Sequence, residues 1–94
     1  MAIRSFKGRE TERLFREGHS GRWCNIASVA IRKLDMLDAA ETLSEMRAPP
    51  GNRLEALRGD RTGQDSVRIN DQWRICFRWT DQGPTEVEIV DYHR

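Results

Sequence analysis

Hydrophobic and polar residues alternate through the second half of the chain, in the period of two that is typical of β-strands. The pattern covers residues 54–58, 64–69, 73–80 and 85–92. Gly, Asp, Asn, Gln and Pro are frequent in the short stretches between these segments, and such residues favour tight turns. We therefore predict four strands joined in an antiparallel meander.

The first half of the chain has a helical period instead. Residues 8–18 hold good helix formers and end at Gly18, a residue type that commonly terminates a helix. A second helix is predicted from Trp23 to about Glu41, because apolar residues recur there every three or four positions. Its expected core-facing residues are Ile26, Ala30, Leu34 and Leu37, with Ala27 and Ile31 beside them.

Two further segments complete the predicted order of elements. Residues 2–6 loosely alternate apolar and polar side chains, so a short strand is expected there. Residues 42–53 contain Pro-Pro-Gly, which cannot continue a helix, and are expected to form a connector. The order predicts an α+β fold, in which two N-terminal helices pack on one face of a small, mainly antiparallel sheet. The 94 residues are expected to form a single domain, 1–94, around one modest core.

Arginines occupy the polar side of the predicted hairpin at 67–79. Arg68, Arg74 and Arg78 alternate with apolar residues, so they should point away from the helices. Neighbouring antiparallel strands bring side chains of one face to within about 5 Å, where guanidinium groups repel one another. Such a cluster is useful for binding phosphate, because the planar guanidinium fork matches phosphate oxygens. The simpler interpretation is a solvated surface of the sheet.

Composition narrows the classes of partner. Charged residues make up 33% of the chain, yet the formal net charge is only +1, so a generic polycation for nucleic acid is disfavoured. Cys24 and Cys76 match no metal-ligand spacing, and no apolar run approaches the roughly 20 residues that span a bilayer. No signal-peptide pattern opens the sequence. We expect a reduced, cytoplasmic protein without membrane contact.

Several motifs resemble one family. The stretch PPGNRLEALRGDRTGQDSVRINDQWRICFRW, followed by VEIVDYH, is similar to the HigB branch of the RelE superfamily. These proteins, also called plasmid maintenance killer proteins, are toxins of type II toxin–antitoxin pairs. The resemblance covers nearly the whole chain, including the opening IRSFK. It implies a compact sheet with two N-terminal helices and cleavage of messenger RNA, typically on the ribosome. It also implies a helix-turn-helix, HigA-like antitoxin, and operator DNA bound only through that antitoxin.

Cleavage of this kind needs no metal or cofactor if the RNA's own 2′-OH attacks the adjacent phosphorus. The protein must then take a proton, stabilise the phosphorane charge and protonate the leaving 5′-oxygen. We expect Arg68 and Arg74 to stabilise charge. Base and acid are expected among Asp91 and His93, with Tyr92 orienting a group or stacking on a base. The basic residues expected to bind RNA beside them are Arg58, Arg61 and Arg78.

This chain departs from its relatives at two positions. Where some relatives carry a histidine after the Pro-rich connector, this chain has Glu55, so a carboxylate is a further candidate base. Asp65 stands where relatives often place an aromatic residue, and an anion there would weaken RNA approach or pair with an arginine. The last segment raises a third question. A regular strand would aim Asp91 and His93 at the core, so we expect a twist or bulge near Val90 that gathers Asp91, Tyr92 and His93 at the mouth of the cleft. The alternative is that only Tyr92 reaches the arginine face while His93 lies at the edge of the sheet.

Two functions remain open at this point. The first is an endoribonuclease toxin. The second is a non-catalytic module that binds the antitoxin or acts as its corepressor partner, and such a module has no need for the arginines or for the terminal VDYH. Each candidate also has a structural alternative. The alternatives are a surface carboxylate for Glu55, an arginine partner for Asp91, packing for Tyr92 and a non-catalytic tail for His93.

Overall fold

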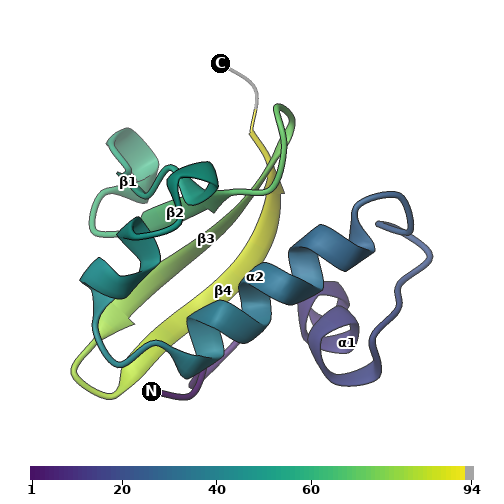
Figure 1. Ribbon diagram of the computed structural model, residues 1–94, viewed down its shortest axis with the longest axis horizontal. Coiled ribbons are helices and arrows are strands. Elements are labelled where there is room, and N and C mark those ends of the chain that lie inside the picture. Colours follow the sequence, from purple (N-terminus) through teal and green to yellow (C-terminus); the bar gives the residue numbers. More distant parts are fainter. Residues whose placement is uncertain (93–94) are drawn as a thin grey trace.

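A four-stranded antiparallel sheet in the order β1-β2-β3-β4 forms the body of the protein in this computed structural model, which describes residues 1–92. The strands are β1 (Glu55–Ala56), β2 (Asp65–Arg68), β3 (Trp73–Thr80) and β4 (Gly83–Asp91). Two helices, α1 (Arg9–Glu17) and α2 (Ala27–Ala39), precede the sheet in the chain. Figure 1 shows α2 lying across one face of the sheet, with α1 beside it. The predicted α+β fold is confirmed.

The helices and the sheet bury one core between them. The helical side contributes apolar residues at the predicted spacing, including Ala30, Leu34 and Leu37, all fully buried. Three strands and the residue directly after β2 contribute the other side, namely Val67, Ile69, Ile75, Phe77, Val87 and Ile89. A shift of one residue in the pairing would turn every one of these side chains to the opposite face. Burial of the apolar set therefore fixes which side chains face away from the helices.

The chain entering and leaving α2 differs from the prediction. The helix begins at Ala27 rather than Trp23, because residues 23–26 form a turn in which Ile26 N donates to Trp23 O at 3.0 Å. The helix ends at Ala39, and Ala40 is already extended. Three short 3₁₀ helices occupy the irregular segments, namely η1 (Leu43–Arg47), η2 (Pro50–Asn52) and η3 (Gly59–Arg61). The predicted connector at 42–53 is thus folded into η1 and η2.

The prediction of a strand at 2–6 is wrong. Phe6 forms one isolated parallel bridge with Val87, and no strand includes residues 2–6. Backbone hydrogen bonds still hold this segment against β4, since Arg4 N donates to Pro84 O at 2.8 Å and Lys7 N donates to Val87 O at 2.9 Å. Ile3 N donates to Asp38 Oδ1 at 2.8 Å instead of to a strand. On the other side, β4 is bulged opposite β3 between Cys76 and Arg78, where Glu86 has a φ of 53°.

Membrane insertion finds no support among the helices that the structure describes, since none is long and apolar enough to cross a bilayer.

The first strand of the predicted meander is shorter than expected. The segment 54–58 pairs only through Glu55 and Ala56, which face Ser66 and Asp65 at the edge of the sheet. The chain then turns through η3 before it returns as β2.

Gly83 provides a test of how the N-terminal segment is held. Its φ is +120°, and a Cβ atom there would lie 2.6 Å from the carbonyl oxygen of Ala2. We expect Gly83→Ala to lower the free energy of unfolding by about 1–3 kcal/mol, measured by urea denaturation. Gly21→Ala is the matched control, because nothing lies within 4 Å of its Cβ position. Equal stability of the two variants would contradict the close approach.

Candidate active site

Arg68 and Arg74 lie directly opposite each other on β2 and β3. Both side chains leave the sheet on the side away from the core, as the alternation predicts. They line a polar cleft of about 430 Å³. The other residues around this cleft are Arg53, Glu55, Asn70, Asp71 and Tyr92. The structure therefore brings Arg68 and Arg74 together on one face of the sheet, while their roles in binding and catalysis remain predictions.

Arg74 is held rigidly at the floor of the cleft, with 6% of its surface exposed. Its Nε donates to Ser66 Oγ at 2.7 Å, and its Nη2 donates to Arg53 O at 2.7 Å. The guanidinium carbon also lies 5.9 Å from the centre of the Tyr92 ring. These hydrogen bonds orient the guanidinium within the cleft. Ser66, two residues before Arg68 on the same strand face, was not predicted, although the alternation could have found it.

Arg68 is more exposed and has a charged partner. Its Nη2 donates to Asp71 Oδ1 in the turn that joins β2 to β3. About a third of the Arg68 side chain is accessible, whereas Asp71 is fully exposed. An exposed ion pair of this kind contributes on the order of 0–1 kcal/mol. The Arg68 guanidinium can therefore leave Asp71 for a phosphate at small cost, whereas Arg74 is already in place.

Hydrogen bonds join the β2–β3 turn to the C-terminal end of β4. Asn70 Oδ1 accepts from Gln72 N and Trp73 N at 2.9 and 2.8 Å, which closes the turn. Gln72 O accepts from Tyr92 N at 2.7 Å, and Gln72 Nε2 donates to Asp91 Oδ2 at 3.1 Å. These bonds bring Tyr92 to the cleft that Arg68 and Arg74 line. The same turn thus leads into β3, which carries Arg74, and positions the end of β4 beside it.

The irregularity of β4 is not where we predicted it. Pairing is regular from Cys76 to Trp73 and reaches Asp91, so no bulge occurs near Val90, and the bulge lies at Glu86 instead. Asp91 keeps the parity of Ile89 but is exposed, because the strand has passed the edge of the core there. It is not among the residues that line the cleft. His93 lies outside the described residues.

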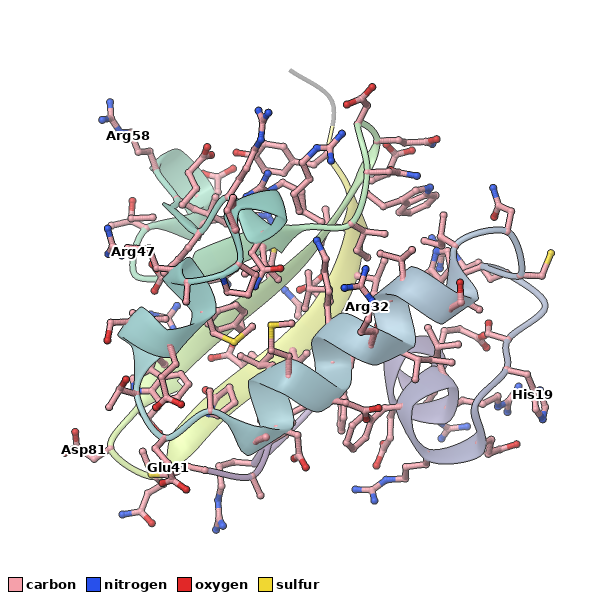
Figure 2. All side chains as sticks on the ribbon, viewed as in Figure 1. His19, Arg32, Glu41, Arg47, Arg58 and Asp81 are labelled. Atoms are coloured by element: carbon pink, nitrogen blue, oxygen red, sulfur yellow. The ribbon has the colours of Figure 1, made fainter. Side chains whose placement is uncertain are left out.

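Glu55 and Tyr92 also border a second hollow. This space, of about 410 Å³, is lined in addition by Ala56, Leu57 and Arg58. Figure 2 shows Arg58 pointing outward at the edge of the molecule, in the segment after β1. Glu55 and Tyr92 thus stand between two adjacent hollows, one with the opposed arginines and one with Arg58.

The other predicted RNA-binding arginines lie elsewhere. Arg61 donates to Gln64 Oε1 at 3.1 Å and lies 3.7 Å from Glu88. Arg78 donates from Nε to Glu86 Oε2 at 3.1 Å. Neither residue lines the cleft. Arg78 lies four residues along β3 from Arg74, and Arg61 lies in η3. The structure therefore separates these two from the opposed pair.

Asp65 does not face the cleft either. It pairs with Phe77 and shares the parity of Val67, so its carboxylate lies on the core side of β2. Burial raises the pKa of the Asp65 carboxyl, and the nearby positive charge of Arg47 opposes that shift. The expected weakening of RNA approach has no basis in this arrangement, because Asp65 and the opposed arginines are on different faces of the sheet.

A helix-backed antiparallel sheet with opposed arginines, a carboxylate and a tyrosine around one cleft describes a small α+β protein with a candidate anion-binding site. The sequence matches the family described as RelE-like toxin of type II toxin–antitoxin system HigB over residues 4–93. The chain therefore belongs to the HigB family of RelE-like toxins.

Individual relatives are similar to this chain to different extents. A segment of 57 residues is 47% identical to Toxin HigB-1 of Vibrio cholerae, covering 61% of this chain and 60% of that protein. An uncharacterised protein of Haemophilus influenzae is 38% identical over 61 residues, 65% of this chain and 60% of that protein. The chain thus spans 60% of the length of each of these two relatives. Endoribonuclease HigB of Proteus vulgaris is 29% identical over 92 residues, 97% of this chain and 99% of that protein.

The two cysteines should differ in reactivity. Cys24 is exposed, whereas Cys76 is fully buried in β3 beside Arg74. Burial raises the pKa of the Cys76 thiol to about 11, so at neutral pH it stays protonated and is a poor nucleophile. We expect iodoacetamide to modify Cys24 alone in the folded protein and both thiols after denaturation, as read by intact mass. Two adducts at similar rates in the folded protein would rule out this packing.

Proposed function

We propose that this protein is the toxin of a type II toxin–antitoxin pair and acts in the cytoplasm as a metal-independent endoribonuclease on messenger RNA. The observation that carries the proposal is the opposition of Arg68 and Arg74 in a cleft that Glu55 and Tyr92 also line. The name of the relative from Proteus vulgaris, Endoribonuclease HigB, supports the same reaction. The alternative of a non-catalytic module leaves the arrangement of these four side chains without a purpose.

The proposed reaction is an internal transfer within the RNA. The 2′-oxygen forms a bond to the adjacent phosphorus while the bond from phosphorus to the 5′-oxygen breaks. One proton leaves the 2′-OH and one proton reaches the 5′-oxygen, so the protein needs a base and an acid. Extra negative charge develops on the two non-bridging oxygens, and Arg68 and Arg74, which line the cleft, would stabilise it. The products are a 2′,3′-cyclic phosphate and a free 5′-hydroxyl.

Among the candidate bases, Glu55 has the strongest support, because it lines the same cleft as both arginines. Asp91 is the second candidate, although its carboxylate accepts from Gln72 at the end of β4. We assign His93 the role of acid. Tyr92 lies between the two hollows, where its ring can stack on a base next to the scissile phosphate. Arg58 would then bind the RNA backbone in the second hollow.

The proposal includes three partners. A type II toxin is paired with an antitoxin, and we propose a helix-turn-helix, HigA-like protein through which operator DNA is bound. The other partners are messenger RNA and the ribosome. The net charge of +1 supports a need for the ribosome, since so small a charge gives weak general attraction to RNA. The ribosome would supply the substrate at high local concentration.

Loss of either opposed arginine should abolish most of the activity. We expect Arg68→Ala and Arg74→Ala each to lower the single-turnover rate of mRNA cleavage on ribosomes by about 100-fold, because one donor to the phosphorane is lost. Arg78→Ala is the control, because that side chain has an exposed ion pair and lies outside the cleft. Its rate should stay within about threefold of the unchanged protein. Full growth arrest by both single cleft variants would overturn the assignment of Arg68 and Arg74 to the site.

The ends of the RNA fragments report the nucleophile. We expect 2′,3′-cyclic phosphate and 5′-hydroxyl ends, because the attacking group belongs to the RNA. A substrate with a 2′-deoxy sugar before the scissile phosphate should not be cleaved, although it should bind. Cleavage of free RNA at high protein concentration should survive excess chelator. If magnesium alone restores chelator-sensitive cleavage of that free RNA, the proposed mechanism is wrong.

A further inference from the structure

Lys33 is a buried cation that the proposed chemistry does not use. It lies on the core side of α2, three residues after Ala30 and four before Leu37, and 5% of its surface is exposed. Its ammonium donates to Gly51 O at 3.2 Å and to Arg68 O. Taking an ammonium out of water is unfavourable unless hydrogen bonds compensate for it. An apolar residue of similar volume is often neutral or stabilising at such a position.

The two carbonyl groups belong to the two sides of the cleft. Arg68 ends β2 and carries one phosphate-binding guanidinium. Gly51 lies in η2, two residues before Arg53, whose own carbonyl accepts from Arg74 Nη2 at 2.7 Å. Arg53 has a φ of 45°, an unfavourable conformation for a residue with a Cβ atom. The contact with Lys33 therefore fixes a strained loop against the end of β2, directly behind both arginines.

The charge of Lys33 is also close to the site. Its pKa is lowered, first by burial and then by the positive charges of Arg32, Arg68 and Arg74. The interaction acts in both directions, so the positive charge of Lys33 also acts on Arg68 and Arg74. Because both acceptors are neutral carbonyls, they leave the charge of the ammonium uncancelled. The potential in the cleft is raised by a group that no ligand needs to touch.

We propose that Lys33 is a positioning residue of the phosphate site, which joins η2 to β2 so that Arg68 and Arg74 are held at the spacing of one phosphate group. This role deepens the proposed function and rests on it. It predicts that Lys33 affects phosphate affinity and cleavage without contact with the RNA. A residue that served packing alone would change the stability of the fold and leave the affinity of each folded molecule unchanged.

The experiment measures inorganic phosphate binding and cleavage in the same variants. Titration with phosphate is followed by the Nε–H resonances of Arg68 and Arg74 in the full chain. We expect Lys33→Met to weaken phosphate binding about tenfold and to slow single-turnover cleavage 10- to 100-fold, since small misplacement of binding groups has effects of that size. Lys33→Arg, which keeps charge and donors, should restore most of both quantities. Circular dichroism confirms the folded fraction.

Arg32→Met is the matched control, because Arg32 is the adjacent residue on α2 and is exposed, as Figure 2 shows. It loses the same formal charge and should stay within about twofold in both measurements. Wild-type phosphate affinity in Lys33→Met would overturn the role of Lys33, and Lys33→Gln decides in the same way if the Met variant does not fold. Absence of cleavage by the unchanged protein would instead contradict the proposed function, while the phosphate titration would still test Lys33.

Discussion

The opposition of two guanidinium groups on neighbouring strands is the constraint on which the site depends. Arg68 and Arg74 repel each other across the β2–β3 ladder, at a spacing where cross-strand pairs interact. The fold tolerates the repulsion in two ways. Neutral oxygens of Ser66 and Arg53 hold Arg74, and the exposed carboxylate of Asp71 pairs with Arg68. Arg74 is thus held in place by hydrogen bonds, and Arg68 has an exposed partner that an anion can replace.

The apolar core determines where these arginines point. Val67 and Ile75 are register partners and fully buried, which leaves Arg68 and Arg74 on the other face by the alternation of the strands. A slip by one residue would place guanidinium groups in the core, so the hydrophobic burial that stabilises the fold also selects the register of the site. The bulge at Glu86 lies on the far side of Cys76 and leaves this part of the ladder regular.

Sequence reasoning found the features that follow from local periodicity. Alternation placed Arg68 and Arg74 together, and the helical period of α2 marked its core residues. The prediction failed where contacts between residues far apart in the sequence determine the local structure. Residues 2–6 make a single bridge to β4 and form no strand, and the irregularity of β4 lies at Glu86 rather than near Val90. Arg61 and Arg78 lie outside the cleft and contact acidic residues of β4 instead.

The contrast between Arg74 and Arg68 bears on how RNA would be selected under the proposed function. Arg74 loses little freedom on binding, because its hydrogen bonds exist before a phosphate arrives. Arg68 must exchange the Asp71 carboxylate for a phosphate oxygen, so part of the attraction is cancelled until that exchange occurs. With a net charge of only +1, the chain has little further attraction for a random RNA strand. Under the proposed function, the exchange at Arg68 and the small net charge together predict a low affinity for free RNA, and presentation by the ribosome would overcome it by raising the local concentration of the scissile phosphate.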